Sequence, residues 1–146
     1  MSRLVTILQK AHAGENAAYL AYEGHWRSLS KKNPSAAETI KDIQKDEWFH
    51  RQSVGFMLIE LDARPSPARE ALMWLIGKTT SALCYVSGNW ASAVGAEMIE
   101  KIGSVSYWEA AELARDEGYP AMATYLEEMA RTEEEHETFF KLLKNS

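Results

Sequence analysis

Cysteine is nearly absent from the sequence, since Cys84 is its one example. An internal disulfide framework and a Cys-x-x-Cys metal site are therefore excluded. Proline and glycine are sparse, at 4 and 8 residues among 146. No stretch alternates apolar and polar residues long enough to suggest a half-buried strand. The chain is therefore predicted to be all-helical.

Runs of basic residues and long uninterrupted apolar runs are also missing. There is no Lys/Arg run and the formal net charge is −5, which argues against nucleic acid as a partner. No basic start precedes an apolar core, and Lys78, Gly88 and Asn89 interrupt the longest weakly polar region, 71–95. We therefore expect neither a signal peptide nor a transmembrane segment. A reducing cytoplasm is the expected location.

With 46% hydrophobic and 25% charged residues, residues 1–146 are expected to form one globular domain. Turn residues divide it into four long helices and a short connecting one. The first helix is expected over 2–30, and the second is expected to follow Asn33-Pro34, with a Ser35/Glu38 capping box, and to end near Asp62. The other expected spans are Pro67 to about Gly77 with Ser66 as N-cap, 80–116, and a last helix to 143 or 144. Two short turns and a long crossover at 63–79 are typical of a ferritin-like antiparallel four-helix bundle built from two hairpins.

Each long helix has an apolar seam at steps of three and four residues, and each seam becomes polar near its middle. The seam expected for 80–116 includes Leu83, Val86 and Trp90. The polar seam residues are Glu15 in the first long helix, Glu47 and His50 in the second, Glu97 and Glu100 in the third, and Glu133 and His136 in the fourth.

Several carboxylates at buried positions need compensation, because each unpaired charge costs several kcal/mol against a domain stability of ~5–15 kcal/mol. No lysine or arginine lies in the seams. Two divalent cations would neutralise four ionised glutamates. The i, i+3 spacing of Glu47/His50 and of Glu133/His136 puts an oxygen and a nitrogen donor on one helix face. We therefore predict a dinuclear site.

The predicted ligands, which are also the catalytic candidates, are Glu15, Glu47, His50, Glu100, Glu133 and His136. Glu100 is preferred over Glu97 because it lies about as far before its turn as Glu15 does. Glu97 remains a candidate additional metal ligand or proton-transfer group. A carboxylate-rich set without thiolate favours iron, with manganese as the alternative, over zinc.

For four other polar residues near these ligands, the sequence leaves two alternative roles open. Asp46 is expected either to hydrogen-bond a metal-binding histidine of another helix or to lie at the surface. His12, one turn before Glu15, is either a group supporting the site or a half-buried histidine. Tyr22 and Tyr107 are candidates for hydrogen bonding or one-electron chemistry near the metals, with packing as the alternative.

These residues resemble the ferritin-like di-iron carboxylate superfamily along nearly the whole chain. Within it, His12-Ala13-Gly14-Glu15, the spacing from Glu47 to Arg64-Pro65, and Tyr107 after Glu100 are similar to demethoxyubiquinone hydroxylase. That resemblance implies oxygen-dependent hydroxylation of a quinone ring at a di-iron centre, with an apolar entrance at a membrane surface. Residues 71–90 are the candidate entrance, and bundle core is the alternative. Ser106 departs from the family, which has histidine before the tyrosine.

Glu97-x-x-Glu100 is instead similar to the additional helix-three glutamate of rubrerythrins, which reduce peroxide. The alternatives are therefore a rubrerythrin-like peroxidase and a non-catalytic iron-binding or ferroxidase protein. The implied partners are dioxygen or peroxide, an external electron donor and, for the hydroxylase, a quinone. Peripheral membrane attachment and homodimerisation are left open.

Overall fold

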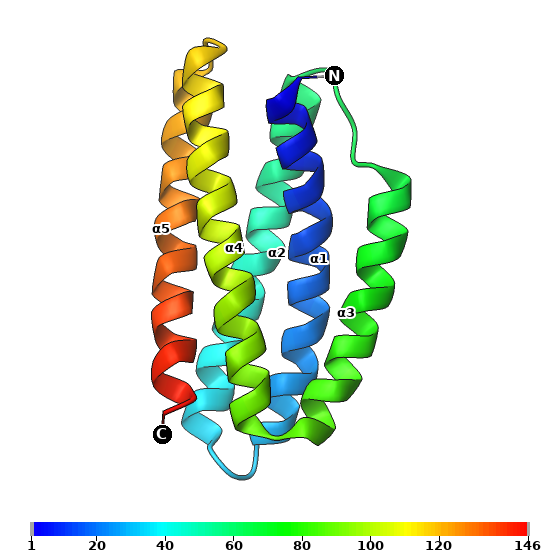
Figure 1. The fold of residues 1–146 in the computed structure, drawn as a ribbon, viewed down its shortest axis with the longest axis vertical. Coiled ribbons are helices and arrows are strands. Elements are labelled where there is room, and N and C mark those ends of the chain that lie inside the picture. The colour runs from blue at the N-terminus through cyan, green and yellow to red at the C-terminus, as the bar shows by residue number, and fades with distance from the viewer. Residues whose placement is uncertain (1, 146) are drawn as a thin grey trace.

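Five α-helices form the secondary structure of the computed structural model, which describes residues 2–145. No strand occurs among these residues, so the all-α prediction is confirmed. The helices are α1 (Arg3–Leu29), α2 (Pro34–Glu60), α3 (Pro67–Ser87), α4 (Asn89–Asp116) and α5 (Pro120–Leu143). They run alternately down and up the long axis, and the termini lie at opposite ends (Figure 1).

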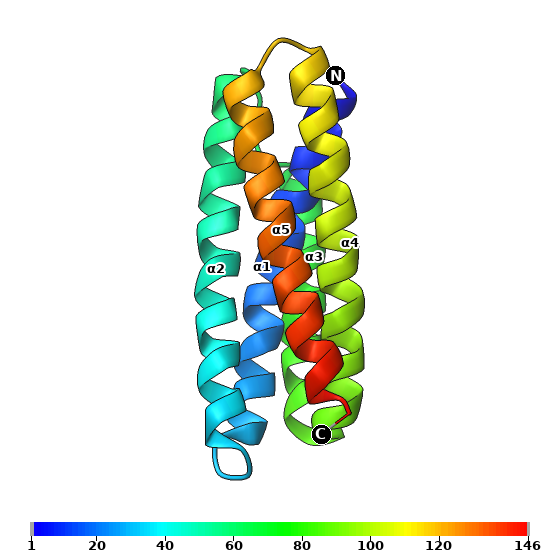
Figure 2. The same cartoon turned by 90° about the vertical axis from the view of Figure 1, so that its left-hand side faces the viewer.

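The helices joined by short turns pack against each other, α1 with α2 and α4 with α5. The two pairs also meet, because α1 contacts α4 and α5 contacts α2. Figure 2 shows α5 crossing in front of the bundle between α2 and α4. The crossover helix α3 lies on the outer side of α1 (Figure 1).

α2 begins at Pro34, whereas the prediction had it begin after this proline. Asn33 is the N-cap, its side chain accepts a hydrogen bond from the N–H of Ala36 at 3.2 Å, and Pro34 opens the helix. The predicted capping box of Ser35 and Glu38 is therefore wrong, since Asn33 is the N-cap and both residues lie within the helix. Proline lacks an N–H and has a helical φ, so it fits the first helical position.

The crossover helix is longer than predicted. It does not end at Gly77 but continues through Thr80 to a break at Gly88, whose φ of 84° favours glycine. A Cβ at Gly77 would lie 2.8 Å from Ala17 Cα, so this glycine allows close helix packing rather than ending a helix. The prediction failed because a glycine that serves tertiary packing has the same sequence signal as a helix stop.

Two glycines bring α1 and α3 into close backbone contact. Besides Gly77, Gly24 of α1 faces the Ser81 carbonyl oxygen, which would lie 1.8 Å from an added Cβ. The opposite side of α3 is left uncovered. The predicted seam is wrong here, because Leu83 and Val86 of α3 and Trp90 of α4 are 57%, 75% and 67% exposed. None of the helices within 2–145 has the length and apolar character to cross a membrane.

Two apolar clusters fill the interior at different levels. One combines the start of α1 with the ends of α2 and α4 and the start of α5, and includes Leu8, Leu58 and Leu126. The other combines the end of α1 with the starts of α2 and α4 and the end of α5, and includes Tyr22, Ile40 and Phe140. Because neighbouring helices are antiparallel, the middles of α1, α2, α4 and α5 meet between the clusters.

Candidate metal centre

Six polar side chains from four helices are buried between the apolar clusters, each at most 7% exposed. They are Glu15 of α1, Glu47 and His50 of α2, Glu100 of α4, and Glu133 and His136 of α5. All six were singled out from their seam positions. The i, i+3 spacing in α2 and in α5 places the glutamate and the histidine on the same inward face.

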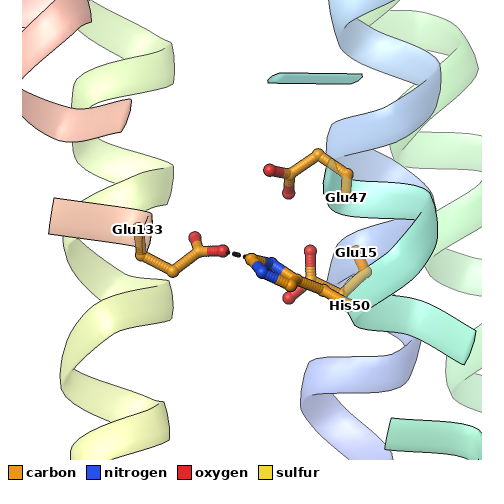
Figure 3. Close-up of side chains that lie close together, drawn as sticks. All are labelled: Glu15, Glu47, His50 and Glu133. Carbon is orange, nitrogen blue, oxygen red and sulfur yellow. Dashed lines mark ion pairs between the residues drawn. The ribbon is translucent and has the colours of Figure 1, made fainter. Parts of the chain in front are cut away.

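The six side chains form two overlapping groups that could each hold a metal ion. One group is Glu15, Glu47, His50 and Glu133, and the other is Glu47, Glu100, Glu133 and His136. Within each group, one donor atom from every residue lies within 4.8 Å of the others. Figure 3 shows the first group, with Glu133 pointing across from α5 toward His50 and Glu15. Glu47 and Glu133 belong to both groups.

Donor atoms of these residues converge at ion-pair distances from one another. His50 Nδ1 lies 2.7 Å from Glu133 Oε1, the ion pair drawn in Figure 3, yet neither atom has a hydrogen-bond partner. Leaving a buried polar atom unpaired costs about 1–3 kcal/mol, and five such atoms gather here. Carboxylate oxygens and imidazole nitrogens in this proportion fit iron or manganese. The atoms are Glu47 Oε1, His50 Nδ1, Glu100 Oε2, Glu133 Oε1 and His136 Nδ1.

The carboxyl groups carry the electrostatic cost of this crowding. Burial raises the pKa of Glu15 from 4.5 to about 7. Burial, followed by repulsion from neighbouring carboxylates, also raises the pKa values of Glu47 and Glu133 well above their usual range. Metal ligation requires the ionised forms, and a bound cation would supply the charge that stabilises them.

The two histidines are suited to donate a ring nitrogen. Burial and the nearby His136 lower the pKa of His50 to about 4, so its ring stays neutral. Although burial lowers the pKa of His136, contacts with Glu100 and Asp46 outweigh it and raise the pKa. His136 Nε2 lies 3.2 Å from Asp46 Oδ2, the contact that was one reading of Asp46. An Nε2–H donated to Asp46 leaves the Nδ1 lone pair toward the glutamates.

Two buried tyrosines hold glutamates of the site. Tyr22 of α1 donates its hydroxyl hydrogen bond to Glu100 of α4, and Tyr107 of α4 donates to Glu15 of α1. Burial, followed by the neighbouring carboxylates, raises the pKa of each tyrosine, so both remain protonated donors. The hydrogen-bonding reading of these residues therefore holds, and each bond joins the two hairpins.

Glu97 is separated from both groups. Its carboxylate pairs with Lys144, at the C-terminal end of α5. Glu100, one turn further along α4, is the helix-four glutamate that joins the second group. Sequence reasoning also missed Glu70 and Arg51, which contact His12. No spacing signal identifies them, because their contacts depend on how α3 crosses α1.

An all-α protein with four buried glutamates and two buried histidines in its interior belongs to the class of carboxylate proteins that can hold two metal ions. The sequence profile of ubiquinone biosynthesis protein COQ7 matches residues 2–138. The chain therefore belongs to this family, which is a ferritin-like di-iron carboxylate family of demethoxyubiquinone hydroxylases. The expected class, a di-iron oxidoreductase, is confirmed by this membership. No individual curated protein matches the chain.

Proposed function

We propose that the chain is a di-iron monooxygenase that hydroxylates a quinone-related ring in ubiquinone biosynthesis. In this proposal α1, α2, α4 and α5 are the ferritin-like bundle, residues 1–146 are one domain and α3 is its crossover. The observation that carries the proposal is the pair of overlapping donor groups that share Glu47 and Glu133. Family membership supplies the reaction class.

The overlap of the groups suggests a role for each ligand. Glu47 and Glu133 belong to both groups and would help to hold both ions. Glu15 with His50, and Glu100 with His136, would complete the separate ligand sets of the two ions. When bound, two iron ions would supply the redox chemistry that activates dioxygen. Their charge would also stabilise the ionised form of the four glutamates.

Hydroxylation sets requirements beyond the metal ligands. One oxygen atom enters a ring C–H bond and the other leaves as water, which consumes two electrons and two protons from an external donor. The chain contributes two apolar clusters that keep bulk water from the site on both sides. Tyr22 and Tyr107 would fix the orientation of Glu100 and Glu15.

The uncovered surface of α3 is proposed as the approach of a lipophilic quinone. Residues 71–90 were expected to be either an apolar entrance or bundle core, and large apolar side chains here lie at the surface. An exposed apolar surface of this kind is suited to peripheral contact with a membrane. The exposed side chains include Leu72, Trp74, Leu75, Leu83, Tyr85 and Val86.

Metal binding and turnover together test the proposal. Protein reconstituted anaerobically with ferrous iron should hold two ions per chain, and should hydroxylate a short-chain quinol substrate when given oxygen and a reductant. Glu47→Gln and Glu133→Gln should lose metal and activity, since each removes a shared ligand. Glu97→Gln is the matched control and should keep both metals, because Glu97 is paired with Lys144.

Contrary results would separate the alternatives. Fewer than two metals per chain, unchanged in the two ligand variants, would rule out the metal centre. Two metals with rapid peroxide reduction and no ring hydroxylation would identify a peroxidase, and ferric product without turnover would identify iron handling. Offering manganese and iron together would decide which metal the site retains.

A further inference from the structure

A second polar cluster, which includes His12 one helical turn before Glu15 in α1, borders a cavity. The cavity has a volume of about 380 Å³ and opens beside α1, α2 and the α2–α3 connection. This is within the range of ~300–1,000 Å³ typical of small-molecule sites. His12 and Arg51 contribute polar groups, while Phe56, Ile59 and Pro65 contribute apolar walls.

The polar groups at the cavity are held in fixed positions. His12 Nδ1 lies 2.7 Å from Glu70 Oε1, and the His12 side chain is only 10% exposed. Arg51 donates through Nη2 to Glu70 Oε2 at 2.7 Å and through Nη1 to the His12 carbonyl oxygen at 2.9 Å. The network joins α1, α2 and α3, so its geometry depends on all three helices.

The network determines which ring nitrogen of His12 carries the hydrogen. Burial opposes ionisation of Glu70, but hydrogen bonds from His12 and Arg51 outweigh it and lower the pKa of Glu70. An ionised carboxylate only accepts hydrogen bonds, so Nδ1 of His12 carries the hydrogen that it donates. In the neutral ring, Nε2 is then an acceptor.

Gly55 leaves that acceptor accessible. A Cβ added at Gly55 would lie 3.4 Å from His12 Nε2 and 3.6 Å from Cδ2, so the glycine is directly beside the nitrogen. Both residues line the cavity. Since Glu70 bonds to Nδ1, and no other side chain among residues 2–145 bonds to this ring, Nε2 is available to a ligand.

The chemistry of the cavity selects the ligand. Arg51, which contacts the His12 carbonyl oxygen, is already paired with Glu70, while Arg64 and Gln52 also line the cavity. Phe56 and Ile59 are 71% and 67% exposed, and an apolar ring would cover them. The His12 Nε2 acceptor, in a cavity with the apolar side chains of Phe56, Ile59 and Pro65, matches a ring that carries a hydroxyl donor.

We propose that this cavity binds the hydroxyl-bearing, reduced form of an aromatic substrate, with a ring hydroxyl donating a hydrogen bond to His12 Nε2. The identification of the ring as substrate rests on the proposed function, whereas the binding site stands on its own geometry. Along the helices, His12 precedes Glu15 by one turn and Arg51 directly follows His50.

Binding of two probes to the metal-loaded protein tests the site. Anaerobic titration calorimetry would compare hydroquinone with 1,4-dimethoxybenzene, which lacks a hydroxyl donor. Hydroquinone should bind about five- to tenfold more tightly, the usual effect of one hydrogen bond. His12→Phe should abolish this preference. Gly55→Leu should weaken both probes more than tenfold, because its Cβ fits at ordinary contact distance and the rest of its side chain fills the cavity.

A matched glycine in α4 serves as the control. Gly95 is exposed and a Cβ there meets nothing within 4 Å, so Gly95→Leu should leave the affinities of both probes unchanged. Absence of hydroquinone binding, or a preference that survives in His12→Phe, would overturn the site. Wild-type affinities in Gly55→Leu would overturn it too, even if His12→Phe did not fold. Metal content, measured on the same samples, reports on the proposed function separately.

Discussion

Gly103 of α4 offers a way to displace one proposed metal ligand, Glu133, without removing it. A Cβ at this position would lie 2.6 Å from Glu133 Oε2 and 3.3 Å from Glu133 Cδ. The obstructed atoms are the end of a flexible side chain rather than backbone. Gly103→Ala should therefore keep the fold and force the Glu133 carboxylate to move.

The size of this displacement can be compared with what a metal site tolerates. An ordinary contact of about 3.4 Å requires the 2.6 Å separation to grow by about 0.8 Å. Metal–ligand distances vary by only about 0.2 Å. We expect the affinity for metal to fall by about 10- to 100-fold, the scale seen when groups that support ligands are removed.

Gly103→Ala should lower the affinity for metal but raise the stability of the metal-free protein. Alanine is favoured over glycine inside a helix by about 0.8–1 kcal/mol, so metal-free Gly103→Ala should melt about 2–4 °C higher than wild type. The extra stability gained from added metal should shrink by about 1.4 kcal/mol for each tenfold loss of affinity.

Metal titration and thermal unfolding, with and without chelator, measure both effects. Gly95→Ala in the same helix is the control, since its Cβ has no neighbour within 4 Å. It should raise the melting temperature and leave the affinity unchanged. If Gly103→Ala bound two metals as tightly as Gly95→Ala, Glu133 would not be a ligand.

Three further predictions concern the surroundings of the site. In chelator, the melting temperature should fall from pH 5 to pH 8, because the pKa of Glu15 is raised from 4.5 to about 7 and the associated stability is lost as pH rises through that value. The affinity for metal should instead rise with pH, because metal ligands must be deprotonated. A metal-free protein that is more stable at pH 8 than at pH 5 would contradict the raised pKa of Glu15. Tyr22→Phe and Tyr107→Phe should each lower the free energy of unfolding, measured by chemical denaturation, by about 1–3 kcal/mol and should weaken metal binding. Unchanged metal affinity in both variants would show that the tyrosines do not position the glutamates. Gly24→Ala should destabilise the metal-free protein by more than about 3 kcal/mol, since its Cβ would lie 1.8 Å from an α3 carbonyl oxygen, whereas Gly14→Ala, with nothing within 4 Å, should be neutral or stabilising.

The six clustered donor residues could be predicted because each is a polar residue in an otherwise apolar helix seam. Glutamate is unremarkable on a helix surface, but Glu47 and Glu133 occupy seam positions whose neighbours are apolar. A charged residue in such a seam signals a compensating partner. The distance to the following turn favoured Glu100 over Glu97, and the structure groups Glu100 with the other donors and pairs Glu97 with Lys144.

The extent of α3 could not be predicted because its signals depend on another helix. Gly77 has the sequence signature of a helix end, yet its role is to contact the backbone of Ala17. Apolar residues such as Leu83 and Val86 were assigned to a buried seam, because periodicity does not distinguish a core face from an uncovered one. The network of His12, Glu70 and Arg51 depends on the position of α3 and was missed for the same reason.

The tyrosine contacts imply that the site and the assembly of the hairpins depend on each other. The first hairpin supplies Glu15 and Tyr22, and the second supplies Glu100 and Tyr107. Each tyrosine bonds the glutamate of the opposite hairpin, and each candidate metal group also draws donors from both. Neither hairpin alone therefore completes a metal group or satisfies its own buried glutamate. Binding of metal should consequently favour docking of the hairpins, and the close approach of Glu47 and Glu133, which burial alone opposes, becomes favourable only when both hairpins and the cations are present.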